Sequence, residues 1–263
     1  MKLSAYIDDL TAHGKCTFTL DDALAGLNKS RSAVIKAIQH LKKKKEIVSP
    51  AKGFYVIVDP EYRIYGCLPA EYFIPYLMKY WQQPYYAGLL TAAEYHGAAH
   101  QKPQTFQIIT TKKKPAIQCG KIKIEFLMKE EMKNLPLQSF STAKSILNVS
   151  TPEVTAMDLV CYHRQSGGFN QIVTVLAELC EFMNSDKLLA LAENSLQIVW
   201  KQRLGFLLEQ VGALQLADAL QKHLSLQKRV DYVLLAPSAN TKNNCKRDTK
   251  WKIIMNTMIE GDV

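Results

Sequence analysis

Two histidines, His96 and His100, stand four residues apart, the spacing that places two imidazoles on one face of a helix. Helical zinc sites of metalloproteases use this spacing together with a glutamate directly after the first histidine. Gly97 occupies that position here, and no cysteine lies nearby in the sequence. Because zinc takes three or four protein ligands, the pair predicts no metal site. The favoured interpretation of His96 is a hydrogen-bonded core histidine.

A second group of reactive side chains consists of Glu125, Glu131 and Lys133. Its order is similar to the carboxylate–lysine core of restriction-type nucleases. Such sites normally include an upstream aspartate that shares a divalent metal. No aspartate occurs between Pro60 and Met157, so a glutamate would have to take its place. A metal-dependent nuclease is therefore an alternative that the sequence disfavours.

Motifs for nucleophilic catalysis or phosphate binding are missing from the sequence. Cys161 and His163 are two residues apart on a predicted helix, so their side chains point in different directions and do not form a catalytic pair. The chain has no P-loop and no GxGxxG segment, and Gly167-Gly168 is best interpreted as a turn. The sequence therefore predicts a protein that is not an enzyme and holds neither a cofactor nor a metal.

The most informative polar residues lie on a predicted helix that runs from residue 31 to about residue 43. At 100° per residue, Val34, Ile38 and Leu41 fall on one apolar face. The opposite face is polar and basic, and consists of Ser32, Lys36, Gln39, His40 and Lys43. Hydrogen-bond donors and positive charge at this pitch are suited to the major groove of double-stranded DNA.

Two kinds of DNA contact follow from this interpretation. The side chains expected to reach base edges are Ser32, Lys36, Gln39 and His40. Those expected to hold phosphates are Lys29, Arg31, Lys43, Lys44 and Lys52. This number of phosphate contacts predicts strong salt dependence and non-specific dissociation constants of roughly 10⁻⁴–10⁻⁶ M near physiological salt. Because one domain reads only a few base pairs, two copies are expected to bind an inverted repeat as a dimer.

The elements around this face predict a winged helix-turn-helix over residues 1–58. Thr19 is expected to cap the second helix, with Asp22 in the capping-box position, and Ser30 to cap the third. The β-prone runs after the third helix are joined by a basic tip and indicate a hairpin wing. In order, helices are predicted at 2–12, 20–27 and 31–43, a short strand at 17–19, and wing strands at 46–48 and 54–58.

The charge distribution supports a polyanionic partner for this module. The chain of 263 residues carries a formal net charge of +9. Residues 1–58 hold ten Lys and Arg against five Asp and Glu, a net +5, so more than half of the excess lies in under a quarter of the chain. The start of the chain lacks the apolar run of a signal peptide, and no segment is long enough to span a membrane. Six widely spaced cysteines indicate free thiols in the cytoplasm.

The remaining sequence is expected to form a connector at 59–68 and a larger mixed α+β domain at 69–263, which makes the whole chain α+β. Helices are predicted at 69–82, 85–99, 151–163 with Thr151 as cap, 170–183 with Asn170 as cap, and within 186–224. Strands are predicted at 106–111, 121–128, 230–236 and 251–255. Lys112–Lys114 forms a basic turn, and a polar loop covers 237–249.

Four segments of this larger domain carry a family resemblance. They are PYYAGLLTAAEYHG at 84–97 with QKPQ at 101–104, STPEVTAMDLV at 150–160, SGGFN at 166–170 ahead of LAEL at 176–179, and WKII at 251–254 followed by Asn256. In this order they resemble the AbiEi family, the antitoxins of type IV abortive-infection toxin–antitoxin systems. Together with the winged helix, the resemblance covers nearly the whole chain. Thr91 departs mildly from it, because a serine is expected there.

The resemblance implies a phage-defence antitoxin with two functions. The winged helix would bind inverted repeats in its own promoter and repress the operon. The larger domain would neutralise a toxin that resembles a nucleotidyltransferase, without a stable complex between the two proteins. No catalytic residues are carried over, because the motifs look structural, and His96 receives no chemical role.

A closely related alternative is a solitary transcription regulator whose second domain senses a ligand or dimerises. A gene for a nucleotidyltransferase-like protein next to this one would favour the antitoxin, and its absence would favour the regulator. From the charge partition, residues 59–263 alone are expected to retain any antitoxin activity.

Overall fold

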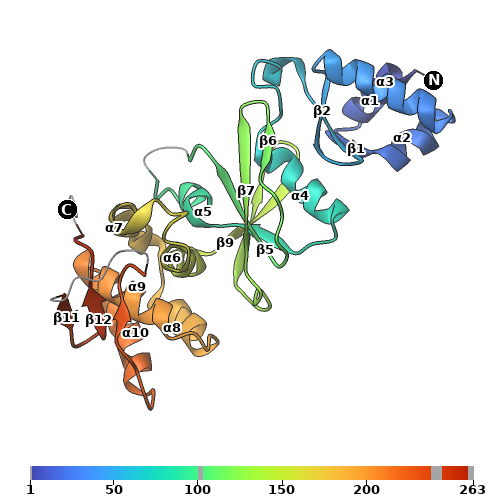
Figure 1. The fold of residues 1–263 in the computed structure, drawn as a ribbon. Helices are drawn as coiled ribbons and strands as arrows, with labels where there is room; N and C mark the ends of the chain where they lie inside the picture. Colours follow the sequence, from blue (N-terminus) through green and yellow to red (C-terminus); the bar gives the residue numbers. More distant parts are fainter. Residues whose placement is uncertain (1, 100–102, 238–244, 260–263) are drawn as a thin grey trace. The chain divides into compact units, whose positions relative to one another are not determined.

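The computed structural model describes residues 2–99, 103–237 and 245–259 (Figure 1). Contacts divide the chain into two compact units. The first consists of Met1–Ala87, Gln104–Lys133 and Gln138–Val149, and the second of Gly88–Pro103, Asn134–Leu137 and Ser150–Val263. Helices and strands occur in both, which confirms the predicted α+β class. No helix within the described ranges combines the length and the apolar character that a membrane span requires.

The first unit begins with three helices and a small antiparallel sheet. The elements are α1 (Leu3–Ala12), β1 (Thr17–Thr19), α2 (Leu20–Leu27), α3 (Arg31–Lys43), β2 (Ile47–Ala51) and β3 (Phe54–Ile57), with strand order β1-β3-β2. This is the predicted order of helix, strand, helix, turn, helix and hairpin. The helices enclose a core of their own, which includes Leu3, Ile7, Phe18, Val34 and Ile38.

Local signals place these helices. The Thr19 hydroxyl accepts a hydrogen bond from Asp22 N–H at 3.1 Å, and the Asp22 carboxylate accepts one from Thr19 N–H at 2.8 Å, as the predicted capping box requires. Asn28 then ends α2 in the left-handed conformation at φ 48°. The turn to α3 is therefore two residues long, since Ser30 already caps the next helix.

Residues 59–68, predicted to be a connector, are packed into the first unit. They contain a short 3₁₀ helix, η1 (Pro60–Tyr62), and the fully buried Cys67 and Leu68. An ion pair of 2.6 Å joins Asp59 to Lys144. Contacts therefore group residues 1–58 with the sheet that follows and do not divide the chain at the connector. That residues 1–58 act as a separate DNA-binding domain stays a prediction.

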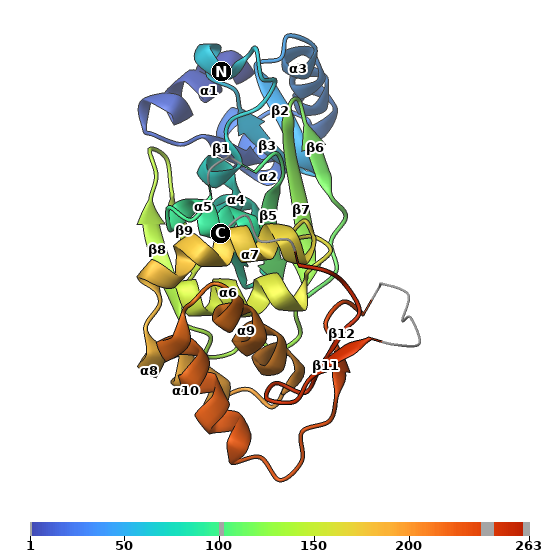
Figure 2. The ribbon, with the colours of Figure 1, turned by 90° about the vertical axis from the view of Figure 1, so that its left-hand side faces the viewer.

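The rest of the first unit is built on a six-stranded sheet of order β6-β7-β5-β4-β9-β8. Its strands are β4 (Tyr85–Ala87), β5 (Phe106–Thr110), β6 (Ile117–Cys119), β7 (Ile122–Met128), β8 (Leu137–Ser141) and β9 (Ile146–Ser150). β5 runs parallel to β7 and antiparallel to β4, and β6 and β7 form an antiparallel hairpin (Figure 2). Before the sheet comes α4 (Ala70–Tyr80), which buries Phe73, Ile74 and Leu77.

The second unit is mainly helical. It contains α5 (Leu89–Tyr95), α6 (Pro152–Cys161), α7 (Gly168–Leu179), η2 (Cys180–Phe182), α8 (Ser185–Glu193), α9 (Val199–Gln210) and α10 (Leu214–Ser225). Strands β10 (Val233–Leu234), β12 (Ile253–Met255) and β11 (Lys246–Asp248) form a small sheet in that order. α6 is buried along most of its length, and α10 packs against both α8 and α9 (Figure 2).

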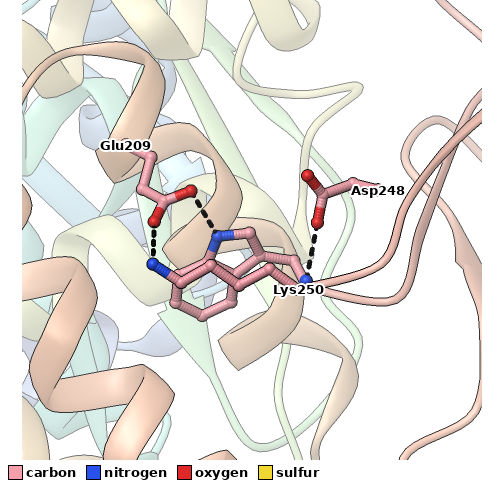
Figure 3. A network of polar contacts seen from close by, with 4 residues as sticks. Glu209, Asp248 and Lys250 are labelled. Carbon is pink, nitrogen blue, oxygen red and sulfur yellow. Dashed lines mark hydrogen bonds and ion pairs between the residues drawn. The ribbon is translucent and has the colours of Figure 1, made fainter.

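A polar network fastens the C-terminal strands to α9 (Figure 3). The indole N–H of the fully buried Trp251 donates to Glu209 at 2.8 Å, and the backbone N–H of Trp251 donates to Asp248 at 2.6 Å. Lys250 forms an ion pair with the same Glu209 carboxylate. Gly205 on α9 leaves the space that the Trp251 ring fills. Trp251 is thus a structural residue.

Four local predictions, of two elements and two caps, were wrong. The helix expected at 85–99 is a strand, β4, followed by the shorter α5. The helix after the glycine pair begins at Gly168, so Asn170 lies inside it and does not cap it. Thr151 precedes α6 as predicted, but its hydroxyl makes no capping bond. Of the polar loop at 237–249, residues 238–244 lie outside the described ranges and 246–248 form β11.

Candidate nucleic-acid interface

Helix α3 is fixed on its module by one apolar face. Val34, Ile38 and Leu41 are buried in the core of the module. At its start the Ser30 hydroxyl accepts a hydrogen bond from Ala33 N–H at 3.4 Å, so the predicted cap is present. The first turn contains no acidic residue, and the end of the helix that carries partial positive charge is therefore not neutralised from within.

All nine residues predicted to contact DNA are exposed. Five of them, Ser32, Lys36, Gln39, His40 and Lys43, lie on the side of α3 opposite its buried face. Lys29 and Arg31 flank the start of the helix, Lys44 follows its end, and Lys52 stands at the tip of the wing. The structure thus leaves these side chains free of the core, while their contact with DNA stays a prediction.

The wing is an antiparallel hairpin whose tip requires a glycine. Gly53 adopts φ 78°, a conformation that strongly favours glycine, and a Cβ there would lie 2.8 Å from the Tyr80 hydroxyl oxygen. The Ser49 hydroxyl hydrogen-bonds to the carbonyls of Ala51 at 2.8 Å and Phe54 at 3.1 Å, which closes the loop. The side chain of Lys52 remains exposed.

Residues of helix α4 contact the wing and fix its position. The Tyr80 hydroxyl donates to the Lys52 carbonyl at 3.1 Å, and the rings of Phe54 and Tyr80 lie 5.5 Å apart. This role of Tyr80 was not predicted from the sequence. Tyr80 is 40% exposed and has no neighbouring motif, so only the tertiary contact reveals that it positions the wing.

A pocket of about 440 Å³ opens between the wing and β6. Its lining includes Pro50, Lys52, Trp81, Lys114 and Cys119. The Lys114 ammonium stands 4.5 Å from the centre of the Trp81 ring, a cation–π contact. The predicted basic turn at Lys112–Lys114 therefore lies in the same part of the unit as the wing tip.

His96 is a hydrogen-bonded, half-buried residue, as predicted. Its Nε2 donates to the Ser150 carbonyl at 2.7 Å, and burial lowers the pKa of the imidazole against the opposing effects of that bond and of Glu153. The second histidine of the pair, His100, lies outside the described residues. Among the described residues, no group of three or more His, Cys, Asp or Glu side chains could hold a metal ion.

The structure does not single out the alternative enzymatic groups as a site. Glu125 lies within β7 and is half-buried, whereas Glu131 and Lys133 are exposed in the segment after that strand. His163 stacks on Phe169 with ring centres 5.1 Å apart, and desolvation lowers the pKa of its imidazole. The most specific chemical feature on the described surface is therefore the polar, basic face of α3.

Two comparisons with known proteins place the chain. Residues 86–210 match the family described as AbiEi antitoxin C-terminal domain. The crystal structure of the RV2827C protein from Mycobacterium tuberculosis has the same fold, with a TM-score of 0.68 and 16% sequence identity over 95% of this chain and 90% of that one. No protein with curated annotation matches the chain.

Proposed function

Residues 86–210 of this chain form an AbiEi antitoxin C-terminal domain, and from that premise we propose that the protein is the DNA-binding antitoxin of a type IV toxin–antitoxin system. It represses its own operon through the winged helix and neutralises a nucleotidyltransferase-like toxin through the larger domain. The protein acts by binding and not by catalysis. Its role is in abortive infection, the defence of a bacterial population against phage.

The observation that carries the DNA-binding half of the proposal is the face of α3. Val34, Ile38 and Leu41 are buried in the core, while Lys36 and Gln39 are exposed in the middle of the helix. A helix anchored in this way can enter the major groove with its polar face toward the base edges. The basic residues around it, including Lys29 and Lys52, supply the phosphate contacts that fix the register.

Repression follows from the geometry of paired sites. One α3 reads only a few base pairs, so a useful operator requires two copies of the chain on an inverted repeat. The operon's promoter is the DNA that supplies such repeats. Binding of two chains there blocks access by RNA polymerase.

Neutralisation of the toxin belongs to the matched region. Residues 86–210 include α5, α6 and α7, whose buried faces build the core of the second unit. The antitoxin and toxin form no stable complex in this proposal, so activity and not co-purification is the appropriate readout.

Point variants separate the two functions better than deletion does. Removal of residues 1–58 would expose α4, because the Cys16 thiol donates to the Tyr72 carbonyl at 3.5 Å and Tyr80 contacts the wing. In Lys36→Ala with Gln39→Ala the packing partners stay. Full-length protein with these substitutions is expected to lose repression of a promoter reporter and to keep rescuing cells that express the neighbouring toxin.

The matched control is Lys222→Ala, an exposed lysine on α10 outside the matched region, which should leave both functions unchanged. If the α3 variant lost rescue together with repression, while staying folded, the assignment of the two functions to different parts of the chain would be wrong. If the neighbouring gene encoded no nucleotidyltransferase-like protein, the solitary transcription regulator would replace the antitoxin. The pocket beside the wing is the feature that this second function would use, as a ligand site.

The nuclease alternative has its own test. Incubation of the protein with DNA or tRNA and Mg²⁺ is expected to leave the nucleic acid intact, for the wild-type chain and for Glu131→Ala alike. Cleavage by the wild type that Glu131→Ala abolished would establish the nuclease instead.

A further inference from the structure

Two glycines bring distant parts of the first unit into backbone contact. A Cβ added to Gly120 would lie 2.1 Å from the Tyr65 carbonyl oxygen and 2.8 Å from Cα of Gly66. The Lys121 N–H donates to the same Tyr65 carbonyl at 2.8 Å. The chain after the wing and the end of β6 therefore pass each other with no side chain between them.

This crossing brings two cysteine thiols together. Cys67 follows Gly66, and Cys119 precedes Gly120. Cys67 is fully buried, Cys119 is 4% exposed, and their side chains are hydrogen-bonded to each other. Neither thiol has a role in the proposed DNA or toxin functions.

The two thiols differ chemically. The hydrogen bond donated by Cys67 lowers the pKa of Cys119, desolvation opposes this, and the nearby Lys42 ammonium lowers it further. The same hydrogen bond and burial raise the pKa of Cys67. Cys119 is thus the better nucleophile and Cys67 the proton donor.

A small oxidant has a route to Cys119. This residue lines the pocket of about 440 Å³ between the wing and β6, whereas Cys67 is fully buried and is not among the lining residues. The thiol that ionises more readily is therefore also the one next to the pocket. Pairing of a reactive cysteine with an adjacent resolving cysteine is the arrangement of thiols that oxidise reversibly.

We propose that Cys67 and Cys119 are a redox-active dithiol, which hydroperoxides convert to a disulfide. The Cys119 thiolate attacks the O–O bond and takes one oxygen to give a sulfenic acid, and the other oxygen leaves as an alkoxide or hydroxide that picks up a proton. The Cys67 sulfur then attacks the Cys119 sulfur, the S–O bond breaks, and water leaves with the Cys67 proton. Two thiols are oxidised and one hydroperoxide is reduced.

The disulfide closes a loop that contains α4, the helix that holds the wing. A cross-link across about fifty residues restricts the unfolded chain strongly, and the thermal midpoint is expected to rise by roughly 5–15 °C on oxidation. Thiol reductants should reverse the rise.

The test is to treat the reduced full-length chain with stoichiometric hydrogen peroxide, block remaining thiols, and map disulfides by mass spectrometry. We expect the tryptic peptides 64–79 and 114–121, which hold Cys67 and Cys119, to be linked to each other and released by reductant. Links spread over several cysteines, or a Cys119 oxidised to sulfinic acid without a link, would overturn the proposal. This mapping needs no variant, so it stands even where substitutions disturb folding.

Variants then separate the roles of the two thiols. Cys67→Ser is expected to stop at a sulfenic acid on Cys119 that dimedone traps, whereas Cys119→Ser should leave Cys67 unoxidised. Cys180→Ser is the matched control, because burial raises the pKa of Cys180 to about 12 and its loss should leave the link unchanged. A link that formed equally fast through Cys180 would also contradict the proposal.

Discussion

Gly205→Ala is the substitution whose effect the structure defines most sharply. A Cβ at this position would lie 2.0 Å from Cζ3 and 2.2 Å from Cη2 of Trp251, distances that real contacts do not reach. The indole cannot move away freely, because its N–H is bonded to Glu209 and its backbone N–H to Asp248. Either α9 shifts or the bond to Glu209 breaks.

Each of these outcomes has a cost of known size. Overpacking of a well-packed core destabilises by about 1–3 kcal/mol. Loss of a hydrogen bond to a charged group costs about 1.5–3 kcal/mol. Alanine is favoured over glycine inside a helix by about 1 kcal/mol, which offsets part of either cost. We therefore expect a net loss of about 2 kcal/mol, or roughly 4–8 °C in thermal midpoint.

The assay is thermal unfolding followed by circular dichroism, with Gln210→Ala as control on the exposed side of the same helix. The control is expected to change stability by less than about 0.5 kcal/mol. In a Trp251→Ala background the Gly205→Ala substitution should cost nothing, because the clash is gone. A Gly205→Ala protein as stable as the wild type would refute the role assigned to Trp251.

Three further predictions concern the DNA face, the wing and the C-terminal network. Lys36→Ala and Gln39→Ala should each weaken operator binding by ~1–3 kcal/mol with relaxed specificity, whereas Lys43→Ala should weaken binding to all DNA sequences equally and reduce the salt slope by roughly one. Gel shifts at several salt concentrations check both effects, and unchanged affinity in all three variants would place the recognition helix elsewhere. Tyr80→Phe removes the bond to the wing carbonyl and should cost about 0.5–1.5 kcal/mol of stability in urea unfolding, and an unchanged midpoint would contradict the role of Tyr80 in holding the wing. Desolvation opposes ionisation of Glu209, but hydrogen bonds from Lys250 and the Trp251 indole outweigh it and lower the pKa. Because the pKa of Glu209 is lowered in the folded state, its contribution to folding stability is present above its ordinary pKa of 4.5 and is lost as the pH falls through the folded-state pKa. Glu209→Gln should flatten this part of the stability–pH curve, and a curve that kept its slope would contradict the assignment.

The winged module was predictable because its signals are local. The caps at Thr19 and Ser30 and the apolar stripe from Val34 to Leu41 are read within a few residues of the bonds and contacts they make. The boundaries of α3 and the presence of the hairpin consequently agree with the prediction, although β2 extends to Ala51 and not only to Val48. The exposure of the five candidate DNA residues on the polar face of α3 follows from the same helical periodicity.

The central sheet was only partly predictable because its pairing is long-range. β4 consists of Tyr85–Ala87, whose sequence is equally compatible with a helix. Only its pairing with β5 and β9 makes it a strand. β8 is an edge strand with mostly exposed side chains and lacks the apolar alternation of a buried strand. Gly66 and Gly120 are more than fifty residues apart in the chain, and no feature of the sequence predicts their contact.

The misplaced cap at Asn170 has a different cause. Gly167 adopts φ 81° and the helix starts directly after it, so a glycine pair that reads as a turn also supplies the entry to α7. The prediction placed a side-chain cap at Asn170. The helix instead begins where the conformational freedom of Gly167 lets the backbone turn into α7. The buried hydroxyl of Thr151, which makes no hydrogen bond within the described structure, is a second case in which the residue type predicts a cap that the fold does not use.

The proposed function requires that the chain bind its own promoter through α3. The most direct measurement is a gel-shift titration of the purified chain against the region upstream of its own gene and a scrambled duplex, at ~150 mM salt so that non-specific phosphate contacts are weak. The account predicts tight, stepwise shifts of the upstream region alone, as two chains fill paired half-sites. Equal and weak binding to both duplexes would contradict it and leave the protein with only a general affinity for nucleic acid.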